Sequence, residues 1–109
     1  MAKKKALKYE WRDLWKSGLG PPSSQRLILY CLSDYMDENG NKCWPSQMGI
    51  SGETDLSERS VRANIAKLKK AGWLKIKQKG YRNKYHKRNQ YFPRIPGFIE
   101  KKKSEKVYV

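Results

Sequence analysis

The stretch Asp55-Leu56-Ser57-Glu58-Arg59-Ser60-Val61-Arg62 predicts a tight turn followed directly by a helix. Asp55-Leu56 is the expected turn, and Ser57 can cap the helix because a serine side chain accepts a hydrogen bond from an N–H of the first turn. The helix is expected to run to about Ala71, because Gly72 follows and glycine favours the conformation that ends helices. This segment therefore predicts the second helix of a helix-turn-helix, the element that enters the major groove of DNA.

Three helices are expected before this segment, and the first two are separated by the helix-breaking run Gly18-Leu19-Gly20-Pro21-Pro22. From Ala6 to Ser17, apolar residues recur at helical spacing, at Leu7, Trp11, Leu14 and Trp15. The apolar face of this helix could cover the domain core or form a dimer contact. The next helix is expected to run from a cap at Ser23 or Ser24 to about Asp37, with a buried stripe of Leu27, Ile28, Cys31, Leu32, Tyr35 and Met36.

A third, shorter helix is expected to support the turn. It follows the turn Asp37–Asn41 and a short extended piece, Lys42–Trp44, which is expected to be a short strand, and it is opened by Pro45-Ser46. It should extend from Gln47 to about Glu53, although it contains two glycines. Each glycine weakens a helix by about 1 kcal/mol relative to alanine.

Two strands are expected after the last helix. Residues Trp73 to Gln78 alternate between apolar and polar, the polar loop Lys79–Arg88 follows, and Asn89–Phe92 can return as the second strand. The predicted fold class is α+β, a winged helix-turn-helix with a three-helix core, a β-hairpin wing and an extra amino-terminal helix. The expected organisation is a basic start and amphipathic helix over residues 1–22, a winged helix-turn-helix domain over 23–93 and a basic tail over 94–109.

Charge is distributed unevenly along the chain. Residues 59–99 contain 13 Lys or Arg and no Asp or Glu, and residues 67–109 carry a net charge of +13 out of the total of +15. A concentration of positive charge on a DNA-reading element attracts the phosphate backbone. The sequence therefore predicts double-stranded DNA as the partner.

Other classes of protein are disfavoured by the sequence. No apolar run approaches the ~18 residues of a membrane span, and no apolar segment of a secretion signal follows the basic start. Cys31 and Cys43 are too few for a disulfide framework and are expected to be buried free thiols; with His86 they lack the spacing of a zinc site. No catalytic arrangement or glycine-rich phosphate loop is present. We expect no enzymatic activity, cofactor or membrane association, and a cytoplasmic location on nucleoid, phage or plasmid DNA.

The candidate DNA-binding residues lie on the two helices of the motif and on the wing. Val61, Ile65 and Leu68 share the face that must pack on the domain, so the opposite face, with Arg59 and Ala63, is free to approach bases. This face could instead be an ordinary solvated surface. The predicted DNA-binding residues are Ser46, Gln47, Ser57, Arg59, Ser60, Arg62, Ala63, Lys67, Lys77, Lys79, Arg82, Lys84, Lys87 and Arg88.

The wing has more than one interpretation. Tyr81, Tyr85 and His86 are interleaved with its basic residues. Such a loop can follow phosphates or place an arginine in the minor groove, but its aromatic rings could also stack on unpaired bases. It could also be a disordered loop whose charges serve solubility. An RNA or single-strand binder, and a protein-interaction module that docks a partner through the Trp-bearing helix, therefore remain alternatives.

Several motifs, in order, resemble a known family. They are the segments Asp34–Gly40, Cys43–Gln47, Leu56–Arg62, Leu68, Gly72–Leu74 and Asn89–Tyr91. Together they resemble the winged helix-turn-helix domains of phage and plasmid replication proteins, such as the amino-terminal domain of replication protein O of lambda-like phages, over about residues 23–93.

The resemblance implies binding of double-stranded DNA, often at repeated origin sequences and often as a homodimer. By position, it implies that Ser46 and Gln47 begin the supporting helix, that Ser57, Arg59, Ser60 and Arg62 begin the reading helix, and that the wing spans Lys77–Arg88. Gly49-Ile50-Ser51-Gly52 departs from the family pattern, so an irregular supporting helix is expected. Replication initiators continue into a partner-binding region, whereas this sequence ends at Val109, so a small autonomous regulator or accessory factor is equally expected. A replication or regulatory protein is a further expected partner.

Overall fold

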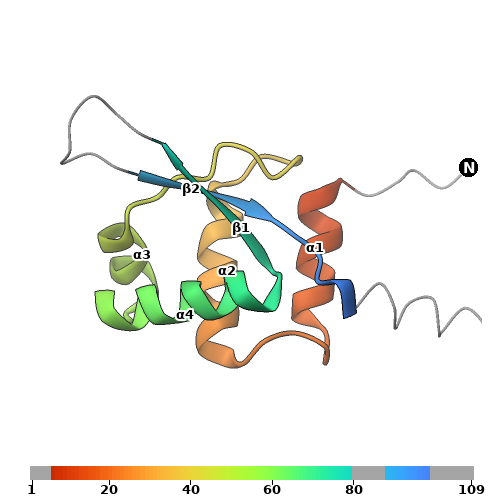
Figure 1. The fold of residues 1–109 in the computed structure, drawn as a ribbon, viewed down its shortest axis with the longest axis horizontal. Helices are drawn as coiled ribbons and strands as arrows, with labels where there is room; N and C mark the ends of the chain where they lie inside the picture. Colours follow the sequence, from red (N-terminus) through yellow and green to blue (C-terminus); the bar gives the residue numbers. More distant parts are fainter. Residues whose placement is uncertain (1–5, 80–87, 99–109) are drawn as a thin grey trace, which may run out of the picture.

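The computed structural model describes residues 6–79 and 88–98 of the chain. Its elements are α1 (Leu7–Lys16), α2 (Ser23–Tyr35), α3 (Gln47–Thr54), α4 (Glu58–Ala71), β1 (Leu74–Lys79) and β2 (Arg88–Pro93). The strands pair in an antiparallel hairpin that crosses the helices (Figure 1). This is an α+β winged helix-turn-helix fold preceded by one more helix, so the predicted fold class is confirmed. The basic start and most of the predicted wing loop and tail lie outside the described residues.

The two helices of the motif begin and end with the local interactions that the sequence predicts. The Ser57 side chain accepts a hydrogen bond from the Ser60 N–H at 3.1 Å, and Gly72 ends α4 with φ of 92°. Ser46 caps α3 in the same way, by accepting from the Gly49 N–H at 2.9 Å. The expectation of an irregular α3 was wrong. The helix is continuous through Gly49 and Gly52, because it is capped at Ser46 and anchored by the fully buried Ile50.

Two predictions for the chain before α3 need correction. The N-cap of α2 is Pro22, without a side-chain cap, so Ser23 is the first helical residue rather than the cap. No strand is present over Lys42–Trp44, although the Tyr91 N–H of the sheet donates a hydrogen bond to the Cys43 carbonyl at 2.8 Å. One bond is insufficient for a ladder, and Lys42 has a positive φ of 65°, which an extended strand does not allow, so the segment forms no strand.

The buried face of α2 also differs from the predicted stripe. Leu29 is fully buried, whereas Leu27 and Tyr35 are about two-fifths exposed. The reason is that α2 contacts α1 on one side and α3 and α4 on the other. This position between three helices widens the buried face and turns it toward Leu29, which a single-stripe pattern does not anticipate.

The amino-terminal helix α1 packs on the domain, which is the first of the two alternatives left open by the sequence. Trp11 and Trp15 are fully buried, and the Trp11 indole N–H donates to the Trp73 carbonyl at 2.9 Å. The two indoles contact each other edge to face, with ring centroids 5.6 Å apart. Both tryptophans belong to the same cluster as the buried residues of α2, α4 and the hairpin, so α1 contributes to the main core.

A matched pair of glycines tests the connection between α1 and α2. A Cβ atom on Gly20 would lie 2.0 Å from the Trp15 carbonyl oxygen, whereas a Cβ on Gly18 would meet nothing within 4 Å. We expect Gly20→Ala to lower the free energy of unfolding by about 1 to 3 kcal/mol, because the backbone of α1 would have to move. Gly18→Ala should leave it within about 0.5 kcal/mol of the parent. Urea denaturation measures both, and equal stabilities would contradict the close packing at Gly20.

Candidate nucleic-acid interface

The helix α4 has one buried face and one exposed face, as its sequence predicts. Val61, Ile65 and Leu68 are buried, with at most 5% exposure. The residues that are exposed to solvent elsewhere on the helix include Arg59, Arg62, Ala63, Ala66, Lys67 and Lys70. Short alanine side chains let a helix approach base edges closely, while arginines beside them can reach guanine or phosphate.

The first turn of α4 is fixed by an amide that the sequence did not single out. The Asn64 side-chain amide donates to the Ser60 carbonyl at 2.9 Å and to the Ser60 hydroxyl oxygen at 3.1 Å. Because the Ser60 oxygen accepts from Asn64, its own hydrogen can be donated outward to an acceptor such as a phosphate oxygen. The contact could have been predicted from spacing, since Asn64 lies four residues, or one helical turn, after Ser60.

The turn between α3 and α4 is held by short-range hydrogen bonds. Asp55 adopts a left-handed conformation with φ of 61°, which ends α3. The Thr54 hydroxyl donates to the Ile50 carbonyl at 2.7 Å, and the Ser51 hydroxyl donates to the Leu56 carbonyl. The Thr54 bond lies within α3, whereas the Ser51 bond ties α3 to the turn that leads into α4. Ser46 and Ser57 both use their side-chain oxygens as caps, so their positions at the helix starts are explained by folding alone.

The third helix also presents a residue that sequence patterns did not select. Met48, in the first turn of α3, is 72% exposed and is the most exposed large apolar side chain of the described residues. Gln47 beside it is half-buried, and Ser46 is exposed. An exposed methionine at the start of the supporting helix can contact sugars or a thymine methyl group, because its side chain is flexible and polarizable.

Hydrogen bonds between side chains join α2 to α3. The Tyr35 hydroxyl and the Cys31 thiol donate to the two carboxylate oxygens of Glu53, the thiol at 3.0 Å. These hydrogen bonds lower the pKa of Glu53 and, from the donor side, help raise the pKa of Tyr35 to about 12. Both oxygens of the Glu53 carboxylate accept hydrogen bonds from α2, so this side chain holds α3 against α2.

The wing residues are described only in part. Lys77 is exposed on β1, but the side chains of Lys79 and Arg88 and all of Arg82, Lys84 and Lys87 lie outside the described residues. Figure 1 shows that α3, the start of α4 and the end of β1 lie at one end of the molecule, with α1 at the other. The structure therefore brings the predicted residues of α3 and α4 together and directs the hairpin toward the same end.

The described residues offer little for other chemistry. Burial raises the pKa values of Cys31 and Cys43 to about 12, so both thiols stay protonated near neutral pH. No group of three or more potential metal ligands occurs within residues 6–79 and 88–98. In the same part of the chain, no helix is both long enough and apolar enough to cross a membrane.

Comparison with known proteins gives one match. Residues 22–74 match the family model of a helix-turn-helix domain, which covers α2, α3, α4 and the first residue of β1. No curated protein and no solved structure is significantly similar to the chain. The match supports a helix-turn-helix DNA-binding domain in the part of the chain where the capped helices and the exposed basic face lie.

Proposed function

We propose that the protein binds double-stranded DNA with the exposed face of α4 in the major groove and the hairpin along the adjacent backbone. The observation that carries this proposal is the surface of α4. Arg59 and Ala63 are exposed opposite the buried stripe, and Arg62 is exposed on the flank beside them, all at the start of a capped helix. Long basic side chains on the first turns of such a helix reach base edges and phosphates.

The predicted site residues enter this proposal with different roles. Arg59, Arg62 and Ala63 would face bases, while Ser60 and Lys67 would contact phosphates along the flank of α4. Ser46, Gln47 and Ser57 would position the starts of α3 and α4 on the sugar-phosphate backbone of the DNA. The wing residues Lys77, Lys79, Arg82, Lys84, Lys87 and Arg88 would add attraction that is independent of sequence.

The biological setting follows from the sequence resemblance and is part of the proposal. The protein would act in the cytoplasm at a phage- or plasmid-type origin or operator, in replication or in transcription regulation. A homodimer would place two reading helices in successive major grooves, about 34 Å apart. A replication or regulatory protein is a further proposed partner, and no enzymatic step is proposed.

Substitutions on α4 and on the wing test the division of roles. Arg59→Ala or Arg62→Ala should cost about 1 to 3 kcal/mol on a preferred site selected from random duplexes, and should flatten discrimination between sequences. The double substitution of Lys84 and Lys87 by alanine should weaken binding to all duplexes about equally. Lys16→Ala, which removes one charge from α1, is the matched control and should change neither property. Anisotropy titrations of both kinds of duplex measure these effects.

Two outcomes would contradict the proposal. If the wing variant loses discrimination while the α4 variants keep it, base reading lies in the wing. If single strands or RNA of equal length bind more tightly than any duplex at one salt concentration, the protein is a single-strand or RNA binder instead.

A further inference from the structure

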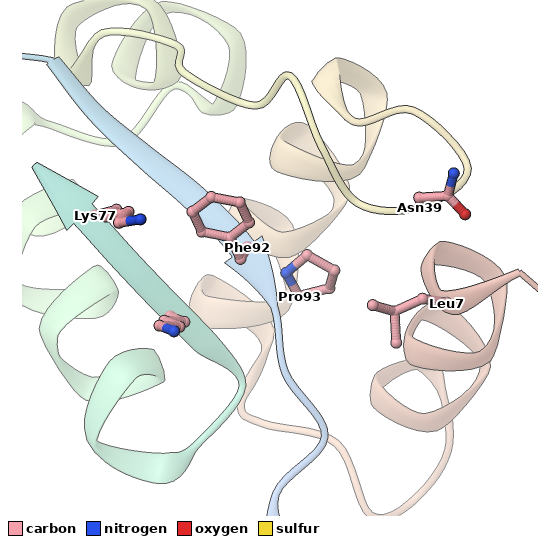
Figure 2. Close-up of a pocket in the computed structure, with 6 residues that line it drawn as sticks. Leu7, Asn39, Lys77, Phe92 and Pro93 are labelled. Carbon is pink, nitrogen blue, oxygen red and sulfur yellow. The ribbon is translucent and has the colours of Figure 1, made fainter. Parts of the chain in front are cut away.

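A separate groove lies on the side of the hairpin that is turned away from the core. It has a volume of about 310 Å³ and is lined by Leu7, Asn39, Lys75, Lys77, Phe92 and Pro93. Figure 2 shows Phe92 on β2 between Lys77 and Pro93, with Asn39 and Leu7 across from them. Four segments that are far apart in the sequence therefore converge here.

Strand register explains why Phe92 and the two lysines share this face. Lys75 pairs with Phe92, whereas the neighbouring pair, Ile76 with Tyr91, points to the core side. Side chains alternate between the two sides of a strand, so Lys75, Lys77 and Phe92 all point away from the core. An aromatic residue on the outer side of a small sheet is not required by the core.

Within the described residues, the Phe92 ring stacks on no other ring, and Lys75 and Lys77 form no ion pair. Phe92 is half-buried, and Lys75 and Lys77 are exposed. Within the described residues, the groove thus combines an aromatic ring that stacks on no other ring with two lysines whose Cα atoms are about 6.6 Å apart along one strand.

The opposite wall of the groove is rigidly built. The Asp37 carboxylate accepts hydrogen bonds from the Asn39 N–H at 3.0 Å and the Asn41 N–H at 2.9 Å. Gly40 has φ of 82°, and a Cβ there would lie 2.3 Å from the Pro93 ring, so the loop packs directly on β2. The Lys8 N–H donates to the Glu38 carbonyl at 3.1 Å and ties the loop to the start of α1. Asn39 is therefore held at the edge of the groove.

We propose that this groove binds one nucleotide of a single-stranded nucleic acid, at a site distinct from the duplex contact of α4 that shares only Lys77 with the duplex-binding wing. A base would stack on Phe92, the ammonium groups of Lys75 and Lys77 would pair with phosphates, and the Asn39 amide would bond the base edge. Stacking on an aromatic side chain flanked by positive charge is the usual mode of single-strand recognition, and it works for DNA and RNA alike.

The size of the groove favours a nucleotide over a peptide. Peptides are normally held along a free strand edge or in a groove long enough for several side chains. This groove lies at the lower limit of volumes for small-molecule sites. Its lining has one aromatic ring, one amide, two cations and the apolar side chains of Leu7 and Pro93. These groups suit a base, the polar edge of that base and the two phosphates that flank one nucleotide in a strand.

The test compares binding of a labelled oligothymidine of about 12 nucleotides, the matching oligouridine and a duplex. Phe92→Leu should weaken single-strand binding about fivefold or more, because leucine fills the site without a stacking face. Phe92→Tyr should bind as the parent does. Lys75→Gln should weaken binding and lower the slope of log affinity against log salt by about 0.7. Duplex affinity should be unchanged in all three variants, because none of them alters α4 or Lys77, the lysine that the groove shares with the duplex contact.

Lys16→Gln is the charge-matched control, since Lys16 ends α1 about 14 Å along the helix from Leu7. The proposal is overturned if Phe92→Leu and Lys75→Gln bind single strands as the parent does, or if Lys16→Gln weakens them as much as Lys75→Gln. It is also overturned if an acidic, leucine-containing peptide binds the parent but not Lys75→Gln while the oligonucleotides show no difference. Lys75 is exposed, so its substitution keeps the test valid even if Phe92→Leu lowers stability.

Comparing thymidine with uridine shows which nucleic acid is preferred. If the parent protein binds single strands but no duplex, the proposed function is wrong and the proposal for this groove is unaffected.

Discussion

Raising the salt concentration from 50 to 200 mM is expected to weaken binding to duplex DNA by about 10³- to 10⁵-fold, if about 6 to 10 phosphates are contacted. The reason is that positive side chains release condensed counterions from DNA when they bind, and added salt opposes that release. The described interface supplies Arg59, Arg62, Lys67 and Lys77. The basic residues of the predicted wing add to this number, so the steep dependence requires both elements to bind at once.

The measurement is a set of anisotropy titrations of one duplex at several salt concentrations. Lys67→Ala should lower the slope by about one, as expected for the loss of a phosphate contact. Lys16→Ala, on α1 at the other end of the molecule, should leave the slope unchanged. Binding that hardly responds to salt would argue that DNA is not the partner.

The helix-turn-helix was predictable because its signals are local. Ser57 and Ser46 specify helix starts through hydrogen bonds to residues three positions later, and Gly72 specifies an end through its own backbone angle. The buried stripe of α4 repeats at helical spacing and needs no knowledge of its neighbours. Most of the candidate interface could therefore be predicted from these short-range patterns and the arginines placed among them.

The features that were missed depend on contacts between distant segments. Whether Leu27 or Leu29 is buried depends on which helices flank α2, and that is decided by tertiary packing. The groove beside Phe92 could not be anticipated, because it forms only when the loop at Asn39, the start of α1 and the hairpin meet. The strand expected over Lys42–Trp44 is absent because Lys42 adopts a positive φ and the bond from the Tyr91 N–H to the Cys43 carbonyl is not extended into a ladder.

The role of α1 was open from the sequence, and its tryptophans now allow a sharp test. Both indoles are fully buried in one cluster, but their N–H groups differ. The Trp11 N–H donates to the Trp73 carbonyl, whereas the Trp15 N–H is buried with no hydrogen-bond acceptor among the described residues. A buried donor without a partner carries a desolvation penalty of about 1 to 3 kcal/mol. The two tryptophans should therefore respond differently to the same substitution.

Trp11→Ala is expected to lower the free energy of unfolding by about 3 to 5 kcal/mol, the usual cost of removing a buried tryptophan. For a domain of this size that corresponds to a fall in the melting temperature of more than about 12 °C. Trp11→Phe should still be destabilising, since it removes the hydrogen bond to Trp73, while Trp15→Phe should cost less because it removes the unpaired donor. Tyr9→Ala, which removes an exposed aromatic of the same helix, should stay within about 0.5 kcal/mol of the parent.

Thermal unfolding followed by circular dichroism, with light scattering on the same samples, measures all four variants. If Trp11→Ala melts like the parent but loses a dimer, α1 is an assembly element rather than part of the core.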